Sequence, residues 1–180
     1  MAETYVALLY SIGIGEGRRL LMADWRALLE DLSLREVRTL IATGNAVFQC
    51  EPAPIRRLEH KLEEAFELRF GRRVDTIVRN AAAIRRLTAA NPFPRQSQRD
   101  GSRVVVRVMR QPLALKAATD LKPYLTQGEQ LKVVDGDLWV YFKTEPNLSK
   151  LMPVLGSKRL GAGTVRNWNT VRRLSEMLGS

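Results

Sequence analysis

The chain has almost none of the residues that bind transition metals. Among 180 residues there is one cysteine, Cys50, and one histidine, His60. A disulfide within the chain is therefore impossible, and one copy cannot assemble a zinc site from Cys and His ligands. We predict no metal site, and no motif identifies a cofactor.

Long apolar segments are also missing. No run approaches the roughly 20 apolar residues that a membrane helix needs, and the N-terminal residues 1–5 lack the basic start and apolar stretch of a signal peptide. We therefore expect a cytoplasmic protein with no membrane partner. The composition is 45% hydrophobic, 27% charged and 7% aromatic, which excludes a disordered or fibrous chain.

Acidic residues are scarce in the second half. Residues 91–180 carry 15 basic and 7 acidic side chains, whereas residues 1–90 carry 14 and 12, within a total net charge of +10. Such an excess attracts phosphate groups, nucleic acid or an acidic partner. The alternative is a solvated surface without a ligand, because 22 of the 29 basic residues are arginine and this bias can reflect base composition of the genome.

The first half alternates short strands with amphipathic helices. Apolar residues three and four apart predict two helices with one buried face each. Short apolar segments bounded by Gly, Pro and Asn predict the strands. In chain order these are a strand at 5–10, a helix at 22–32, strands at 37–42 and 46–49, a helix at 55–70 and a strand at 74–78.

The second half echoes this order. After a helix at 80–90, we expect a strand at 103–109, a helix at 112–121, strands at 129–134 and 138–142, a helix at 147–155 and a terminal helix at 167–178, with one uncertain strand before it. The Asp-Gly pair at 135–136 is a strong hairpin signal. Each half therefore has the β-α-β-β-α-β order of the ferredoxin-like, or split βαβ, fold.

We predict an α+β protein of two ferredoxin-like subdomains packed together, with a pseudo-repeat of element order. The first covers residues 1–90, including a connecting helix, and the second covers residues 103–180 with its C-terminal helix. Residues 91–102, polar and with two prolines, are the best candidate for a linker.

Several segments together resemble the bacterial domain-of-unknown-function family 1697. In order they read YVALL at 5–9, MAD at 22–24 and RAL at 26–28, TGNAVF at 43–48, NPF at 91–93, SKL at 149–151 and TVRNWNT at 164–170. RNWNT is the most specific piece, and the TGN turn is next. The resemblance implies a small, uncharacterised cytoplasmic bacterial protein with two α+β halves, and it implies no reaction.

The chain departs from the family pattern at two places. Tyr10 and Gly13 replace the usual Arg and Asn after the first strand, and Asn147-Leu148 replaces a Gly-Arg pair before SKL. We therefore expect a divergent member, in which any anion site built on those arginines is altered or lost.

The first candidate site is the glycine-rich segment after the first strand, which we expect to be a loop. Glycines let backbone N–H groups approach a phosphate, and arginines clamp it. The spacing matches neither the dinucleotide fingerprint nor the Walker loop, so a purely conformational turn is the alternative. The anion-binding candidates here are Gly13, Gly15, Gly17, Arg18 and Arg19, with Asn45 of the TGN turn as a neighbour or a simple turn residue.

The second candidate site is the start of the terminal helix. Free N–H groups with Arg166 would hold an anion, and Trp168 would stack on a ring. The alternative is structural, with Asn167 or Asn169 capping the helix and Trp168 packing it against the sheet.

The sequence shows no catalytic constellation, and whether the protein is an enzyme stays open. We expect a protein that binds nucleic acid or a phosphorylated small molecule through its basic C-terminal half. The alternatives are an enzyme acting on a small anionic substrate in a cleft between the halves, and a non-catalytic oligomeric scaffold.

Overall fold

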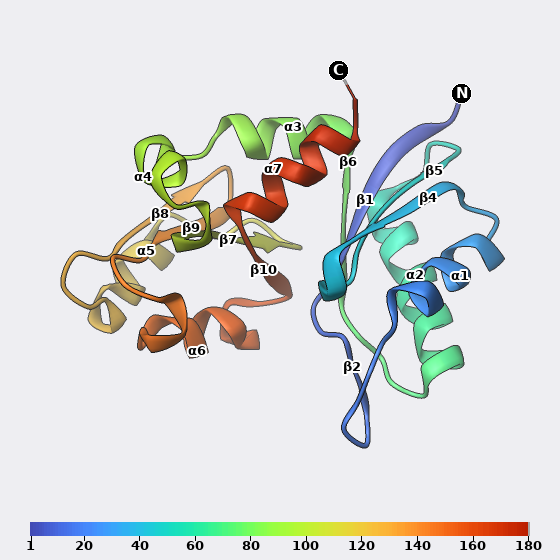
Figure 1. The fold of residues 1–180 in the computed structure, drawn as a ribbon, viewed down its shortest axis with the longest axis horizontal. Helices are drawn as coiled ribbons and strands as arrows, with labels where there is room; N and C mark the ends of the chain where they lie inside the picture. The colour runs from blue at the N-terminus through green and yellow to red at the C-terminus, as the bar shows by residue number, and fades with distance from the viewer. Residues whose placement is uncertain (180) are drawn as a thin grey trace. The chain divides into compact units, whose positions relative to one another are not determined.

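A computed structural model describes residues 1–179 (Figure 1). The chain packs as two units. One comprises Met1–Arg85 together with the C-terminal segment that begins at Leu174, and the other comprises Arg86–Arg173. The boundaries fall inside two helices, α3 (Ala81–Ala89) and α7 (Trp168–Met177), so that each helix continues from one unit into the other.

The first unit is built on one four-stranded antiparallel sheet with the strand order β4-β5-β1-β6. Its elements are β1 (Glu3–Leu9), β2 (Gly13–Gly15), β3 (Arg18–Arg19), α1 (Met22–Asp31), β4 (Arg35–Leu40), β5 (Asn45–Cys50), α2 (Ile55–Phe70) and β6 (Thr76–Asn80). If the small β2–β3 hairpin is set aside, the sheet has the ferredoxin-like order 2-3-1-4, as predicted.

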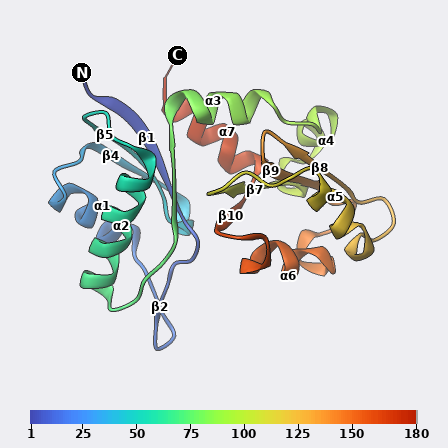
Figure 2. The ribbon, with the colours of Figure 1, turned by 180° about the vertical axis from the view of Figure 1, so that it is seen from behind.

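Helices α1 and α2 lie on the same face of this sheet (Figures 1 and 2). Their apolar stripes bury Trp25, Leu29, Leu62 and Phe66 against alternate residues of the strands, such as Phe48. The helix α2 begins and ends where its 3.6-residue apolar period predicted, and Gly71 follows it in the left-handed conformation that ends helices.

Two buried carboxylates of α2 accept hydrogen bonds from the outward-facing N–H groups of the edge strand β6. Glu63 accepts a hydrogen bond from the Thr76 N–H at 3.0 Å, and Glu59 accepts one from the Val78 N–H at 3.1 Å. Because these N–H groups are occupied, the edge is protected from pairing with another chain. The two glutamates are parts of the fold.

Replacement of Glu63 by alanine is expected to lower the free energy of unfolding by about 1–3 kcal/mol, because it removes the acceptor of a buried N–H group. Glu67→Ala is the matched control, since the exposed Glu67 shares Arg73 with Glu63 but accepts no backbone N–H. Its expected loss is below about 1 kcal/mol. Urea unfolding of both variants checks this, and equal losses would show that the bond to Thr76 contributes nothing.

The second unit repeats the arrangement, with the strand order β10-β7-β9-β8 and all neighbours antiparallel. Its elements are α4 (Pro94–Arg99), β7 (Val104–Met109), α5 (Lys116–Leu121), β8 (Gln130–Val134), β9 (Asp137–Tyr141), α6 (Leu151–Gly156) and β10 (Gly163–Asn167). Short 3-10 turns lie at Ile41–Thr43, Gly101–Arg103, Lys122–Tyr124, Pro146–Leu148 and Lys158–Leu160. The predicted α+β class with two ferredoxin-like halves is confirmed, and the uncertain strand exists as β10.

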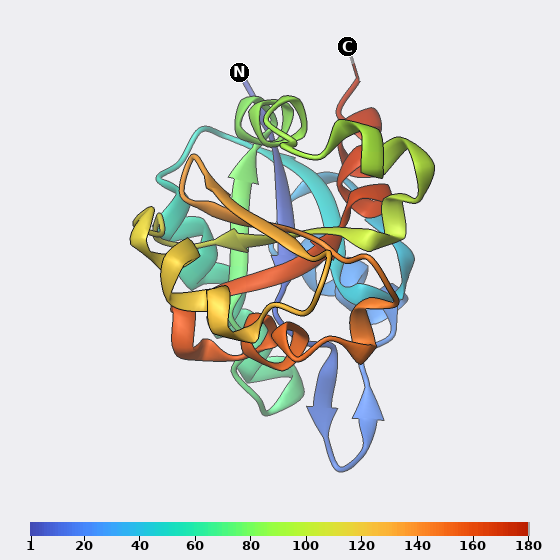
Figure 3. The same ribbon diagram turned by 90° about the vertical axis from the view of Figure 1, so that its left-hand side faces the viewer.

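Residues of β9 alternate between the two faces of the second sheet. Leu138 and Val140 pack with the residues of α5 and α6, while Trp139 contacts Trp168 of α7 and Tyr141 contacts Phe93 just before α4. Accordingly α5 and α6 lie on one face, and α4 with the first turn of α7 lies on the other (Figure 3).

Four local predictions differ from the structure. The segment expected as a loop at residues 11–19 contains the β2–β3 hairpin, since positive φ angles at Gly15 and Gly17 turn the chain back on itself. Residues 91–102, expected as a linker, contain α4, with Phe93 buried beside it. The helix expected at 147–155 is split into a 3-10 turn and α6, and the helix expected at 112–121 begins only at Lys116.

Candidate ligand-binding site

The entire net charge of the protein belongs to the second unit. Arg86–Arg173 carries 16 basic and 6 acidic side chains, a net of +10, whereas the rest of the chain carries 13 of each. The net attraction for a polyanion is therefore strongest at this unit.

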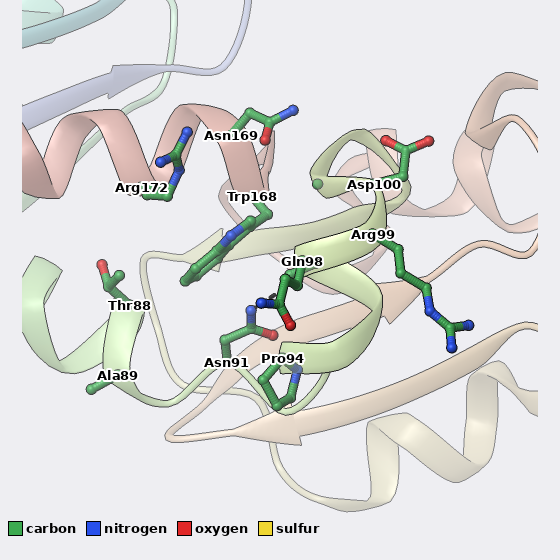
Figure 4. Close-up of a pocket in the computed structure, with 12 residues that line it drawn as sticks. Thr88, Ala89, Asn91, Pro94, Gln98, Arg99, Asp100, Trp168, Asn169 and Arg172 are labelled. Carbon is green, nitrogen blue, oxygen red and sulfur yellow. Dashed lines mark hydrogen bonds between the residues drawn. The ribbon is translucent and has the colours of Figure 1, made fainter.

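The second unit contains a hollow of about 730 Å³, within the usual range for small-ligand pockets. It lies between α4 and the first turns of α7, with the end of α3 as a third wall (Figure 4). We call it the Trp168 pocket. Its lining residues are Thr88, Ala89, Asn91, Pro94, Ser97, Gln98, Arg99, Asp100, Gly101, Trp168, Asn169 and Arg172.

The wall at α4 is fixed by the side chain of Asn91. Its Oδ1 accepts a hydrogen bond from the Phe93 N–H at 2.9 Å, and its Nδ2 donates to the Ser97 hydroxyl at 2.7 Å. Pro94 then starts α4 with its preset φ angle. The NPF segment is thus a rigid turn that anchors α4 through the buried Phe93 ring.

The wall at α7 presents a half-buried tryptophan. The side chain of Asn167 accepts a hydrogen bond from the Thr170 N–H at 2.9 Å, which satisfies a first-turn donor. One side of the Trp168 indole packs on the fully buried Trp139, with ring centres 6.2 Å apart. The rest of the ring lines the pocket and points from α7 toward Thr88 and Asn91 (Figure 4).

Gly101 allows α7 to approach closely. A Cβ atom at this position would lie 2.9 Å from Asn169 Cγ and 3.0 Å from Trp168 Cδ1, inside van der Waals contact. The glycine therefore sets the positions of both side chains in the pocket.

Polar groups without protein partners surround the indole. The amides of Gln98 and Asn169 and the guanidinium of Arg99 are exposed and have no hydrogen-bond partner in the described part of the chain. Asp100 is the only carboxylate in the lining, and it accepts hydrogen bonds from the Ser102 hydroxyl and N–H, which lower its pKa. The pocket thus offers a ring face, two amides and, with Arg172, two arginines.

Of the candidate residues in the RNWNT segment, two line the pocket and two have structural roles. Trp168 and Asn169 line the pocket, and Asn167 caps α7. Arg166 is buried in β10, where it donates hydrogen bonds to the Thr164 hydroxyl and the Val165 carbonyl, and burial lowers the pKa of its guanidinium to about 10. Arg166 is therefore not among the lining residues.

The glycine-rich candidates lie in the first unit. Gly13 and Gly15 form β2, Gly17 is at the turn, and the side chains of Arg18 and Arg19 are exposed on β3. The carboxylate of Glu16 lies 3.9 Å from Arg18 at the tip of the hairpin. None of these residues lines the Trp168 pocket.

Asn45 is the first residue of β5 and is fully buried. Its side-chain amide donates hydrogen bonds to the Leu40 carbonyl at 3.0 Å and to the Thr43 hydroxyl at 2.8 Å, which closes the turn before β5. The structure also shows the positions at which the sequence departs from the family pattern that it resembles. Asn147 and Leu148 are exposed in a 3-10 turn of the second unit, and Tyr10 directly follows β1.

A second hollow, of about 540 Å³, lies on α2 of the first unit. It is lined by Arg56, Arg57, His60, Lys61 and Glu64, all from that one helix. Four of these side chains are already engaged within the unit: Arg56 pairs with Glu59, His60 lies 3.1 Å from Glu64, and Lys61 donates to the Leu32 carbonyl. No apolar residue lines this hollow and no second element walls it, so the Trp168 pocket is the better candidate.

Neither a metal site nor a reactive thiol is found in residues 1–179. The His, Cys, Asp and Glu side chains there form no group of three that would hold a metal ion. Burial raises the pKa of the Cys50 thiol, which disfavours the thiolate. No helix in this range is both long and apolar enough to cross a bilayer.

Two comparisons place the chain among known proteins. The family model described as a protein of unknown function (DUF1697) matches residues 2–139. The solved structure of the conserved bacterial protein SP0830 from Streptococcus pneumoniae superposes with a TM-score of 0.76 and covers 99% of each chain at 21% sequence identity. At that identity the likeness establishes the fold alone. No curated protein matches the chain.

Proposed function

The chain belongs to the DUF1697 family, whose function is unknown, and we propose that its second unit is a binding module for a phosphate-bearing ligand with a planar ring. The observation that supports this most strongly is the Trp168 pocket itself. It combines a half-buried indole with the unpartnered amides of Gln98 and Asn169 and with the exposed guanidinium groups of Arg99 and Arg172, in the unit that carries all of the net charge.

Each group has a role that its chemistry suits. The indole of Trp168, which is in tilted contact with Trp139, offers its exposed part as a surface on which a planar ring stacks. The amides of Gln98 and Asn169 both donate and accept, as recognition of a base edge requires. The guanidinium groups of Arg99 and Arg172 pair with phosphate oxygens.

The lining suits binding better than chemistry. It contains no His, Cys, Lys or Tyr, and its single carboxylate is engaged with Ser102 and with Arg103 at 3.1 Å. The Ser97 hydroxyl accepts a hydrogen bond from the Asn91 amide, and no lining residue beside it can act as a general base. A nucleophile with an adjacent base, which covalent catalysis needs, is missing from this set of residues.

A thermal-shift comparison of nucleoside monophosphates, nucleosides and inorganic phosphate tests the proposal. We expect the monophosphates to raise the melting temperature more than either fragment, because only they engage both the indole and the arginines. If inorganic phosphate alone raises the melting temperature as much as the monophosphates do, the planar ring of the ligand plays no part in binding. If none of the three kinds of compound raises it, the proposal is contradicted.

Gly101→Ala gives a local test of the pocket geometry. Its Cβ atom would lie too close to both the Asn169 side chain and the Trp168 ring, so binding of the monophosphate is expected to fall by at least about 3- to 10-fold, equivalent to loss of one hydrogen bond. The free energy of unfolding is expected to change little, because an exposed side chain can move away. Titration calorimetry together with urea unfolding checks both parts. Unchanged binding would show that Asn169 makes no contact with the ligand.

A further inference from the structure

We propose that the ligand of the Trp168 pocket is one nucleotide of a single-stranded nucleic acid, whose neighbouring phosphates bind to arginines outside the pocket. This inference rests on the proposed function and specifies its ligand class. The evidence is the number of exposed arginines around the pocket, which is larger than one phosphate group can pair with.

The segments that build the pocket are strongly basic. Residues 86–103 and 163–173 together contain seven arginines and one carboxylate, Asp100. Arg166 is buried, and Arg103 is paired with Asp100 and Glu145. The five that remain are exposed: Arg86, Arg95, Arg99, Arg172 and Arg173.

These arginines extend from the pocket along its three walls. Residues three or four apart share a helix face. Arg86 is thereby on the face of α3 that carries Ala89, Arg95 is on the face of α4 that carries Gln98, and Arg173 is on the face of α7 that carries Asn169. All three neighbours line the pocket. The described residues provide no ion-pair partner for Arg86, Arg95 or Arg173.

A single strand fits this arrangement better than a duplex. A base reaches the face of Trp168 only if it leaves its own stack, and single strands offer unstacked bases without the cost of opening pairs. The pocket volume of about 730 Å³ suits one nucleotide. The sheet face that ferredoxin-like RNA-binding modules use for stacking is covered here, since Trp139 and Tyr141 are packed under Trp168 and Phe93.

The test measures binding of fluorescein-labelled oligo-dT of 12 nucleotides to the full chain over a salt series, beside a thymidine monophosphate competitor and a 12-base-pair duplex. We expect the oligonucleotide to bind at least 10-fold more tightly than the monophosphate. The logarithm of its affinity should fall linearly with the logarithm of salt, with a slope of about −2 to −3.5 for three to five phosphate contacts.

Arg95→Ala and Arg173→Ala are each expected to reduce that slope by about 0.7 and to leave binding of the monophosphate unchanged. The matched control is Arg57→Ala, an exposed arginine of the first unit for which the described residues show no ion-pair partner. This control should leave the slope unchanged.

Three outcomes decide between the claims. If the monophosphate binds as tightly as the oligonucleotide, the polymer inference is overturned and the proposed function stands. If the duplex binds as tightly as the single strand, the inference is overturned as well. If neither the monophosphate nor the oligonucleotide binds at low salt, the proposed function itself fails.

Discussion

Trp168→Ala is expected to weaken binding of oligo-dT by about 5- to 150-fold, which corresponds to the roughly 1–3 kcal/mol that stacking of a base on an aromatic side chain contributes. The loss should be this large because Trp168 is the only aromatic residue in the lining of the pocket. Fluorescence anisotropy of the labelled oligonucleotide measures it.

Trp168→Phe is the matched control for this variant. Phenylalanine keeps an aromatic face above Trp139, so binding is expected to fall by less than about 5-fold. Since Trp168 also packs on Trp139, urea unfolding of both variants must show that they remain folded under the binding conditions. A folded Trp168→Ala protein that binds like the native chain would refute the stacking role.

Gly44→Ala is expected to lower the free energy of unfolding of the first unit by about 2–5 kcal/mol. Gly44 has a φ of +79°, which costs a residue with a Cβ atom about 1–2 kcal/mol. In addition, the new Cβ would lie 2.7 Å from Leu9 Cβ in the buried strand β1, and overpacking of a core typically costs about 1–3 kcal/mol.

Gly71→Ala separates these two costs. Gly71 has a similar φ of +72°, but nothing lies within 4 Å of its added Cβ. We therefore expect Gly71→Ala to lose only the conformational part, about 1–2 kcal/mol. Urea unfolding measures both variants. Equal losses would mean that the approach of the turn to Leu9 imposes no steric restriction.

The secondary structure was largely readable from periodicity. The helix α2 occupies the residues that its apolar spacing predicts, and the Asp-Gly pair at 135–136 does join β8 to β9. The β2–β3 hairpin was missed because glycines at 13, 15 and 17 erase the apolar alternation that identifies strands. The short helix α4 was missed because six residues are too few to show a period.

The pocket could be predicted only in part. Trp168 and Asn169 were predicted as ligand contacts from their own segment, and both line it. Asn91 and Gln98 were not, because they are some 70 residues distant in sequence and approach Trp168 only through the fold. A signal was present in the scarcity of carboxylates between residues 86 and 103. The burial of Arg166 depends on the pairing of β10 with β7, which no local pattern reveals.

Intrinsic fluorescence tests most directly whether the ligand occupies the Trp168 pocket. The chain has three tryptophans; Trp25 and Trp139 are fully buried, so only Trp168 can contact a ligand directly. We predict that unlabelled oligo-dT quenches the emission saturably, and that Trp168→Phe, although it still binds, shows much weaker quenching. Saturable binding by anisotropy with no quenching of the native protein would contradict the account, because the ligand would then be bound away from Trp168.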